Sequence, residues 1–403
     1  MAVYARILRT PGLGILIAAT LITRLPLAIN GLAVVLYLRE TTGSFAIAGL
    51  VAGAMAVGSA IGAPRRSTSR PASGAGALMP LAIVHAAAIL AVWALAAAET
   101  PAAVTAGAAL VAGAGFPPTG ALLRSRLPRM LGDDDLVHSA YALDSVGIEL
   151  SFVTGPLITA VLVALAGPQF ALAVSATLML LGTALFLAHF PDRDRGPRPA
   201  ERHRGWLGPL ADRGLRTLAL STVPVGFCLG AIEVAIPAFS SEQGAPAVAG
   251  VLLAVWSAAS GVGGLLYGTR APSDRVVDTF LALAVLFPLT CLPLALAWSP
   301  AAMAVLVVVA GLPIAPLIAS RNRVIGELAP GGTGTESFTW LLTSLVAGLA
   351  AGNALGGILS QHEGWAAGIL LGCAVAAVGG VLGFARRGDL EPRGGELLAR
   401  SGA

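Results

Sequence analysis

The sequence contains no lysine and few charged residues of any kind. All 25 basic residues are arginines, and only 11% of the 403 residues are Asp, Glu, Lys or Arg. A soluble domain carries about twice that charged fraction. The missing lysine excludes a Walker phosphate-binding motif, and with it a fused ATPase. The net charge of +4 indicates no nucleic-acid partner, because the arginines lie in short connectors between apolar runs.

Patterns for metals, disulfides and catalysis are missing as well. The three cysteines, Cys228, Cys291 and Cys373, lie in apolar runs without metal-ligand spacing, so we expect neither a disulfide framework nor a metal site. None of the five histidines forms the His-Glu-x-x-His pattern of metalloproteases. No Gly-x-Ser-x-Gly nucleophile motif has a convincing acid and base at membrane depth. We therefore expect no cofactor and no enzymatic activity.

Long apolar runs and small residues fill the chain instead. Hydrophobic residues make up 56% of the sequence, and 50 residues are glycines. Runs of this length are too long for barrel strands, and a chain in lipid must satisfy its own backbone hydrogen bonds. The sequence therefore predicts an all-α integral membrane protein with twelve transmembrane helices. We place them at about 13–38, 44–63, 77–98, 102–123, 139–165, 168–190, 216–239, 246–268, 277–298, 301–320, 334–360 and 365–385.

The arginines predict how the chain is oriented. With the N-terminus inside, 23 of the 25 arginines fall in cytoplasmic segments. Arg39 lies in an outer connector, and Arg24 lies within the first apolar run. Cytoplasmic connectors of membrane proteins carry an excess of basic residues. We expect a multi-pass protein of the cytoplasmic membrane with both termini in the cytoplasm.

The two halves of the sequence repeat each other. Gly-x-Pro recurs at 115–117 and 311–313, each time followed by an Arg-x-Arg pair, first Arg124 and Arg126 and then Arg321 and Arg323. A connector rich in proline and charge separates the halves, as expected of a solvated linker. We predict two pseudo-symmetric six-helix bundles, 1–190 and 216–385, with a cytoplasmic linker at 191–215 and a cytoplasmic tail at 386–403. Such repeats can form a carrier with its site between them.

Two motif-like segments resemble known transporters. Transporters carry a loop pattern G-x-x-x-D-R-x-G. In the first half Gly62 and Arg70 could match it at a longer spacing, with Ser69 in place of the Asp, while the second half keeps Asp274 and Arg275. The Gly155-Pro156 pair matches part of a helix-five pattern of exporters. On these residues and its twelve-run plan, the chain resembles the major facilitator superfamily, including uncharacterised actinobacterial members. The resemblance implies alternating access, with Ser69, Arg70, Asp274, Arg275, Gly155 and Pro156 in its gates and motifs.

Buried charges are the strongest candidates for chemistry, because each costs about 2.5–3.5 kcal/mol on insertion scales. Arg24 and Glu149 lie about halfway along their runs, so we predict that they pair and that Glu149 binds the transported proton; a permanent structural ion pair is the alternative. Asp144 is five residues from Glu149 and on another face of the helix. We expect Asp144 to pair with Arg124 or Arg126 at the inner gate. Glu233 is predicted to bind a proton or a cationic solute, or to act structurally at the outer gate.

The remaining candidates are polar or aromatic residues of the expected solute cavity. Asn30 and Asn353 are candidates for hydrogen bonds to the solute, whereas His85 is expected to be a packed histidine. The aromatic candidates for the lining are Phe116, Phe152, Trp256 and Trp340. This sparse polar lining favours proton-coupled efflux of a small hydrophobic or amphipathic solute by a monomer in the bilayer. Uptake of a sugar or organic acid, and a receptor that transports nothing, remain the alternatives.

Overall fold

The computed structural model describes residues 6–7, 9–68, 76–190, 208–268, 275–329 and 334–391. Some side chains within these ranges, including those of Glu149 and Glu336, lie outside the description. In this part of the chain the regular elements are helices, without strands. Twelve helical segments are long and apolar enough to cross a membrane, which confirms the predicted count and the all-α class.

The first six spans contain seven helices, because the fourth span is divided. They are α2 (Leu13–Thr42), α3 (Phe45–Thr68), α4 (Leu78–Ala97), α5 (Ala102–Ala114), α6 (Thr119–Leu131), α7 (Asp134–Ala166) and α8 (Pro168–His189). The second six begin with α9 (Arg213–Glu242), α10 (Val248–Gly268) and α11 (Val276–Cys291). They continue with α12 (Pro300–Gly311), α13 (Ile314–Leu328), α14 (Gly334–His362) and α15 (Trp365–Ala385). Short elements η2 (Gly208–Ala211), η3 (Leu292–Leu296) and α16 (Arg387–Leu390) complete the described chain.

Both halves interrupt a span at the repeated Gly-x-Pro. The fourth span breaks between α5 and α6, and the tenth breaks between α12 and α13. Proline lacks the backbone N–H that a helix interior needs and clashes with the preceding turn. The predicted span at 102–123 is therefore divided into two helices, because Pro117 and Pro118 lie between the end of α5 and the start of α6. By contrast, Pro26 and Pro156 lie inside the unbroken helices α2 and α7.

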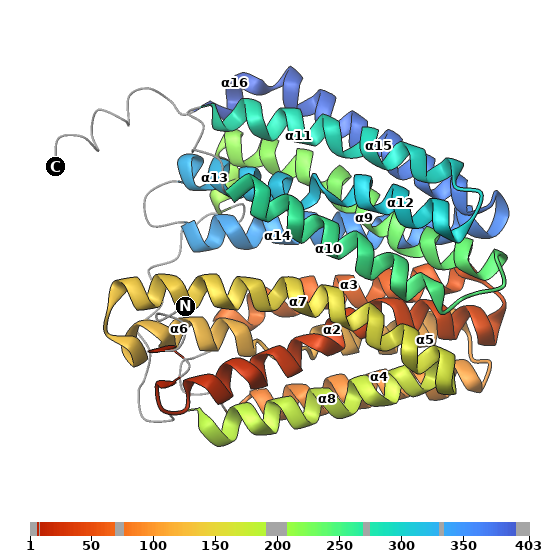
Figure 1. The fold of residues 1–403 in the computed structure, drawn as a ribbon, viewed down its shortest axis with the longest axis horizontal. Coiled ribbons are helices and arrows are strands. Elements are labelled where there is room, and N and C mark those ends of the chain that lie inside the picture. The colour runs from red at the N-terminus through yellow and green to blue at the C-terminus, as the bar shows by residue number, and fades with distance from the viewer. Residues whose placement is uncertain are drawn as a thin grey trace. The chain divides into compact units, whose positions relative to one another are not determined.

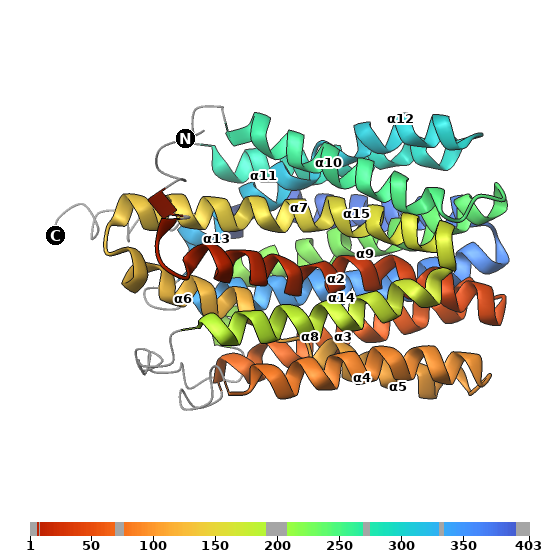
Figure 2. The same ribbon diagram turned by 60° about the horizontal axis from the view of Figure 1, so that its bottom comes forward.

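The chain forms two compact units. The first contains residues 1–199 and 236–257, and the second contains residues 200–235 and 258–403. The predicted division at the linker 191–215 remains a prediction. Within the first unit, α2 packs against α8, α7 and α3, and α3 packs against α5 (Figures 1 and 2). This arrangement gives α2 a central place, and more than half of its residues are buried.

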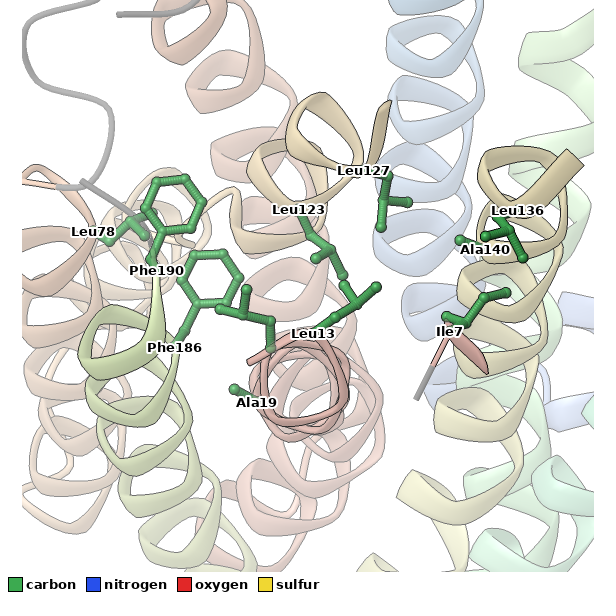
Figure 3. Packing of buried hydrophobic residues seen from close by; sticks show 11 residues of the cluster. Ile7, Leu13, Ala19, Leu78, Leu123, Leu127, Leu136, Ala140, Phe186 and Phe190 are labelled. Atoms are coloured by element: carbon green, nitrogen blue, oxygen red, sulfur yellow. The ribbon is translucent and has the colours of Figure 1, made fainter. Parts of the chain in front are cut away.

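A cluster of buried apolar residues fills the end of the first unit where α2 begins. Figure 3 shows Leu13 and Ala19 of α2 near Leu123 of α6 and Phe186 of α8. The rings of Phe186 and Phe190 stack with their centroids 5.1 Å apart. The Arg126 guanidinium lies 5.3 Å from the centre of the Phe190 ring. This cluster fixes α6, and hence Arg124, against α2.

The second unit is built on close contact between α9 and α14. A Cβ atom at Gly226 would collide with the Leu345 carbonyl oxygen, and one at Gly352 would collide with that of Phe227. Glycine permits this approach because it has no side chain, and small residues drive helix association in lipid. A second packed pair, α11 with α15, lies side by side in Figure 1.

Candidate functional site

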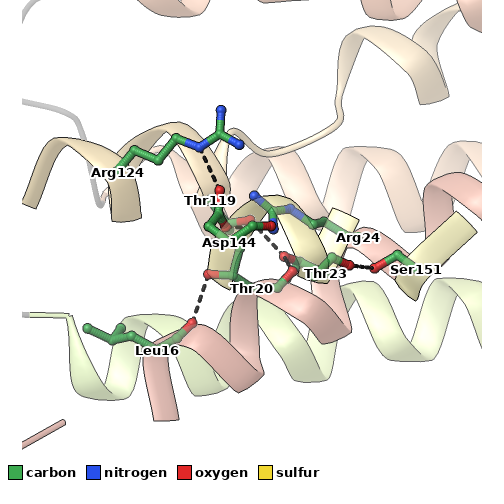
Figure 4. Close-up of polar contacts among 9 residues, drawn as sticks. Leu16, Thr20, Thr23, Arg24, Thr119, Arg124, Asp144 and Ser151 are labelled. Atoms are coloured by element: carbon green, nitrogen blue, oxygen red, sulfur yellow. Dashed lines mark hydrogen bonds and ion pairs between the residues drawn. The ribbon is translucent and has the colours of Figure 1, made fainter. Parts of the chain in front are cut away.

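Three charged side chains meet inside the first unit. Asp144 of α7 accepts from Arg24 Nη1 of α2 at 2.7 Å and from Arg124 Nε of α6 at 2.6 Å (Figure 4). The Asp144 side chain is 3% exposed, Arg24 is 14% exposed and Arg124 is 44% exposed. Arg24 Nη1 also donates to the Asp144 carbonyl oxygen at 3.3 Å. We call these three residues the charged cluster.

The helix break and two glycines make room for the charged cluster. A Cβ atom at Gly120, in the first turn of α6, would lie 2.5 Å from Arg24 Nη2. A Cβ atom at Gly147 of α7 would lie 3.7 Å from Arg24 Nη1. The guanidinium of Arg24 therefore fills space that a side chain at Gly120 would need, whereas a Cβ atom at Gly147 would first meet Leu21 Cδ2, at 2.5 Å. The broken fourth span brings Arg124 to the same carboxylate from the other side.

Hydroxyl groups surround the charged cluster. Thr23 and Thr119 share a hydrogen bond of 2.7 Å that joins α2 to the start of α6. Thr20 donates to the Leu16 carbonyl oxygen at 2.8 Å, and Ser151 donates to that of Gly147 at 2.9 Å. All four hydroxyl residues are buried. Sequence reasoning missed this polar shell, although hydroxyls at 20 and 23 on the side of α2 that carries Arg24 are a readable signal.

Asp144 pairs with Arg124, one of the two partners predicted from the sequence. It also pairs with Arg24, whose predicted partner was Glu149. Gly147 packs on Leu21 and Gly155 on Ala28, so the backbone of Arg24 does lie at the level of α7 residues between 147 and 155. The long arginine side chain then runs back toward the start of its helix, as helix geometry favours. The Glu149 side chain lies outside the described residues, and its pairing with Arg24 remains a prediction.

The charge balance of the cluster decides its chemistry. Two guanidinium groups share one carboxylate, and the more buried guanidinium makes two bonds to the same residue. The buried carboxylate of Asp144 therefore has its charge compensated by two cations. The arrangement suits a structural lock between α2, α6 and α7. Half-exposed Arg124 is the member that could leave during gating, since exposed ion pairs contribute little.

Asn30 and His85 form a second polar contact in the first unit. His85 Nδ1 lies 2.8 Å from the Ala112 carbonyl oxygen, so it donates, and Nε2 accepts from Asn30 Nδ2 at 3.2 Å. Both side chains are buried, which matches the packed role expected of His85. Asn30 Oδ1 has no hydrogen-bond partner among the described residues. Phe116 packs edge-on against His85, with ring centroids 5.5 Å apart.

Replacing His85 with alanine should destabilise the protein by about 1–3 kcal/mol, because Asn30 Nδ2 then loses its partner inside the membrane. Combining His85→Ala with Asn30→Leu should recover part of this loss, since both unpaired polar atoms disappear. Thermal unfolding of the two purified variants in detergent measures the difference. Equal losses in the single and double variants would show that packing volume, rather than the hydrogen bond, is the main contribution of His85.

Glu233 and Asn353 lie together in the second unit, next to the tight contact of α9 with α14. A Cβ atom at Gly230 would lie 2.9 Å from the Asn353 backbone nitrogen, and Glu233 follows Gly230 by one helical turn. Glu233 makes no hydrogen bond or ion pair with any residue that the structure describes. Asn353 is 4% exposed, and its Oδ1 has no partner in the described chain. The helix pair α9 and α14 therefore carries two acceptors, the Glu233 carboxyl group and Asn353 Oδ1, that have no donor among the described residues.

The other predicted residues are dispersed. Phe152 is 41% exposed on α7, Trp256 is buried on α10, and Trp340 is partly buried on α14. Ser69, Arg70 and Asp274 lie outside the described residues, while the Arg275 carbonyl oxygen accepts from Thr279 at the start of α11. An open pocket of about 430 Å³ in the first unit is lined by Leu36, Arg39, Glu40, Gly43, Val163, Pro168, Ser241 and Pro246, none of which was predicted.

Similarity to known proteins was found at the level of structure alone. No protein-family model and no curated protein sequence matches the chain. Among solved structures, the POT family transporter PepTSo matches with a TM-score of 0.73 at 10% identity, covering 94% of this chain and 98% of that one. A bacterial homologue of the iron transporter ferroportin matches with a TM-score of 0.72 at 11% identity, covering 92% and 97%. The nucleoside transporter NupG matches with a TM-score of 0.67 at 13% identity, covering 94% and 100%.

These matches establish the fold. The chain is a multi-pass membrane protein with the twelve-helix fold of major facilitator transporters, as its sequence predicted. At identities of 10–13% the likeness extends to the fold and to no particular solute.

Proposed function

We propose that the protein is a secondary active transporter of the cytoplasmic membrane, with both termini in the cytoplasm. It exports a small hydrophobic or amphipathic solute in exchange for protons by alternating access, and it works as a monomer without a cofactor. The observation that carries the proposal is Glu233, a carboxyl group at membrane depth in α9 without a partner among the described residues. Transporter folds in the matched structures support the class of activity.

Glu233 is the better of the described acids for carrying the proton. Asp144 is held by Arg24 and Arg124, whereas no described cation compensates Glu233. A charge inside the membrane costs about 2.5–3.5 kcal/mol, and proton binding removes that charge. Glu233 can therefore exist in two states that differ in charge, which a proton-driven cycle requires. The Glu149 side chain, outside the description, remains the second candidate from the sequence.

The solute class follows from the residues that the sequence offers for the lining. Phe116, Phe152, Trp256 and Trp340 supply apolar area, and Asn353 Oδ1 supplies an acceptor that has no partner among the described residues. Such a mixture suits a largely apolar solute with one hydrogen-bond donor. The matched structures include a nucleoside transporter and a homologue of an iron transporter, so the fold does not identify the solute.

The test is an accumulation assay in cells that lack their main exporters. Cells expressing the protein should hold less ethidium or Nile red than control cells, and a protonophore should remove the difference. Glu233→Gln should abolish the protonophore-sensitive part of the export, because glutamine cannot exchange a proton. Glu233→Asp should retain a fraction of it. Glu242→Gln is the matched control, because Glu242 is exposed at the end of the same helix.

The alternatives predict other outcomes in the same assay. If Glu233→Gln exports normally and Glu149→Gln does not, Glu149 carries the proton. Uptake would raise the amount of solute in the cells instead of lowering it. If no member of a broad solute panel moves in either direction, the receptor alternative is favoured. Together these results distinguish the proton site, the direction of transport and the class of protein.

A further inference from the structure

The structure holds a buried arginine in the second unit whose charge no described acid compensates. Arg321 of α13 is 8% exposed and lies within the membrane span Pro300–Leu328. Its Nε and Nη2 atoms donate to Asn322 Oδ1, the neighbouring side chain, at 3.3 and 2.9 Å. We propose that Arg321 and Asn322, in the middle of α13, form a binding site for an oxyanion, a phosphate or carboxylate group.

The described acids of α13, of α11 and of the segment near the end of α13 are exposed or have other partners. α13 packs against α11 and α14. Asp278, in the first turn of α11, pairs with Arg387 at 2.9 Å, and Asp389 accepts from Thr217 at 3.0 Å. Glu327 is exposed on α13 itself. Burying a guanidinium without a counter-charge costs free energy. The burial of Arg321 therefore favours a bound anion that compensates its charge.

Comparison with the first half sharpens this inference. Arg124 and Arg321 correspond in the repeated Gly-x-Pro and Arg-x-Arg pattern with a shift of one residue, and both lie on the helix that follows the break. Arg124 has Asp144 at 2.6 Å although it is 44% exposed. The offset between the two arginines places Leu341, a buried residue of α14, at the position that corresponds to Asp144. The second half therefore has a buried arginine, Arg321, and an apolar residue where the first half has Asp144.

The donors at Arg321 have the chemistry that an oxyanion needs. A guanidinium has five N–H donors and matches phosphate and carboxylate in two-point contact. Two of its nitrogens use the same Asn322 oxygen, which leaves Nη1 without a partner in the described chain. Asn322 Nδ2 is a donor and can contact the same anion. The anion can come from an acidic lipid headgroup or from a soluble solute, and the experiment separates these sources.

The experiment measures thermal unfolding of the purified full-length protein in detergent. Inorganic phosphate and benzoate provide soluble oxyanions, and phosphatidylglycerol, with phosphatidylcholine as its neutral comparison, provides the lipid. At least one of these anions should raise the unfolding temperature of the wild type in a saturable manner. Arg321→Gln should bind that anion at least about tenfold more weakly, as expected from the loss of a charged hydrogen bond. Arg321→Lys should retain part of the binding, because the charge remains.

The experiment measures anion binding by the purified protein and no transport, so its failure can be told apart from a failure of the proton-coupled export proposed above. Arg323→Gln removes a neighbouring arginine and should leave the anion effect unchanged. Glu336→Gln tests an acid in the first turn of α14 whose side chain lies outside the described residues. The proposal is overturned if no anion stabilises the wild type, or if the effect persists in Arg321→Gln. It is also overturned if Glu336→Gln creates an anion effect that the wild type lacks, because Glu336 would then be the natural counter-charge.

Discussion

Asp144→Asn should destabilise the protein by about 3–5 kcal/mol, because it leaves Arg24 buried without a counter-charge. The Asp144 carboxylate joins three helices through Arg24 and Arg124, and an asparagine at this place keeps its shape without the charge. Most of the loss should come from Arg24, since half-exposed Arg124 can turn to water. Thermal unfolding in detergent and the yield of folded protein from membranes measure it.

A double variant separates charge from packing at the charged cluster. Arg24→Met with Asp144→Leu replaces the buried pair by apolar side chains, and such replacements are often neutral or stabilising. The double variant should therefore unfold at a higher temperature than Asp144→Asn. An unchanged unfolding temperature for Asp144→Asn, together with lost transport, would contradict the structural role and favour the inner-gate role predicted from the sequence.

Gly352→Ala should cost about 3 kcal/mol or more, although it adds a single methyl group. That methyl group would collide with the Phe227 carbonyl oxygen of α9. A rotamer change cannot relieve the clash because both partners are backbone, so α9 and α14 must move apart. Separation would also disturb the neighbouring contacts at Gly226, Gly230 and Gly348. Unfolding temperature and size-exclusion profile of the purified variant report the effect.

The matched control for this prediction is Gly326→Ala. Gly326 lies inside helix α13, and a Cβ atom there meets nothing within 4 Å. Alanine forms helix better than glycine, so this variant should be neutral or slightly more stable. Similar behaviour of Gly352→Ala and Gly326→Ala would show that α9 and α14 do not depend on their backbone contact.

The sequence determined the class of the molecule and its plan. Twelve apolar runs require helices because lipid offers the backbone no hydrogen-bond partner. The repeated Gly-x-Pro and Arg-x-Arg segments likewise indicated two related halves. The structure interrupts a span at both Gly-x-Pro segments, yet the sequence did not reveal that Pro117 and Pro313 interrupt helices while Pro26 and Pro156 are tolerated. Whether a proline breaks a helix depends on what neighbouring helices supply to the freed backbone groups, which is a tertiary property.

Depth along a helix could be read from the sequence, but the partner of a side chain could not. Counting residues placed Arg24 level with Glu149, and the contacts of Gly147 and Gly155 give its backbone that level. In the tertiary structure Arg24 forms its ion pair with Asp144, because the side chain of arginine is long enough to reach back toward the start of its helix. Likewise, the Arg-x-Arg repeat identified Arg124 and Arg321 as equivalent. Only the packed structure shows that Arg124 has an acid and that buried Arg321 has none among the described residues, because pairing depends on which side chains of distant segments share a small space in lipid.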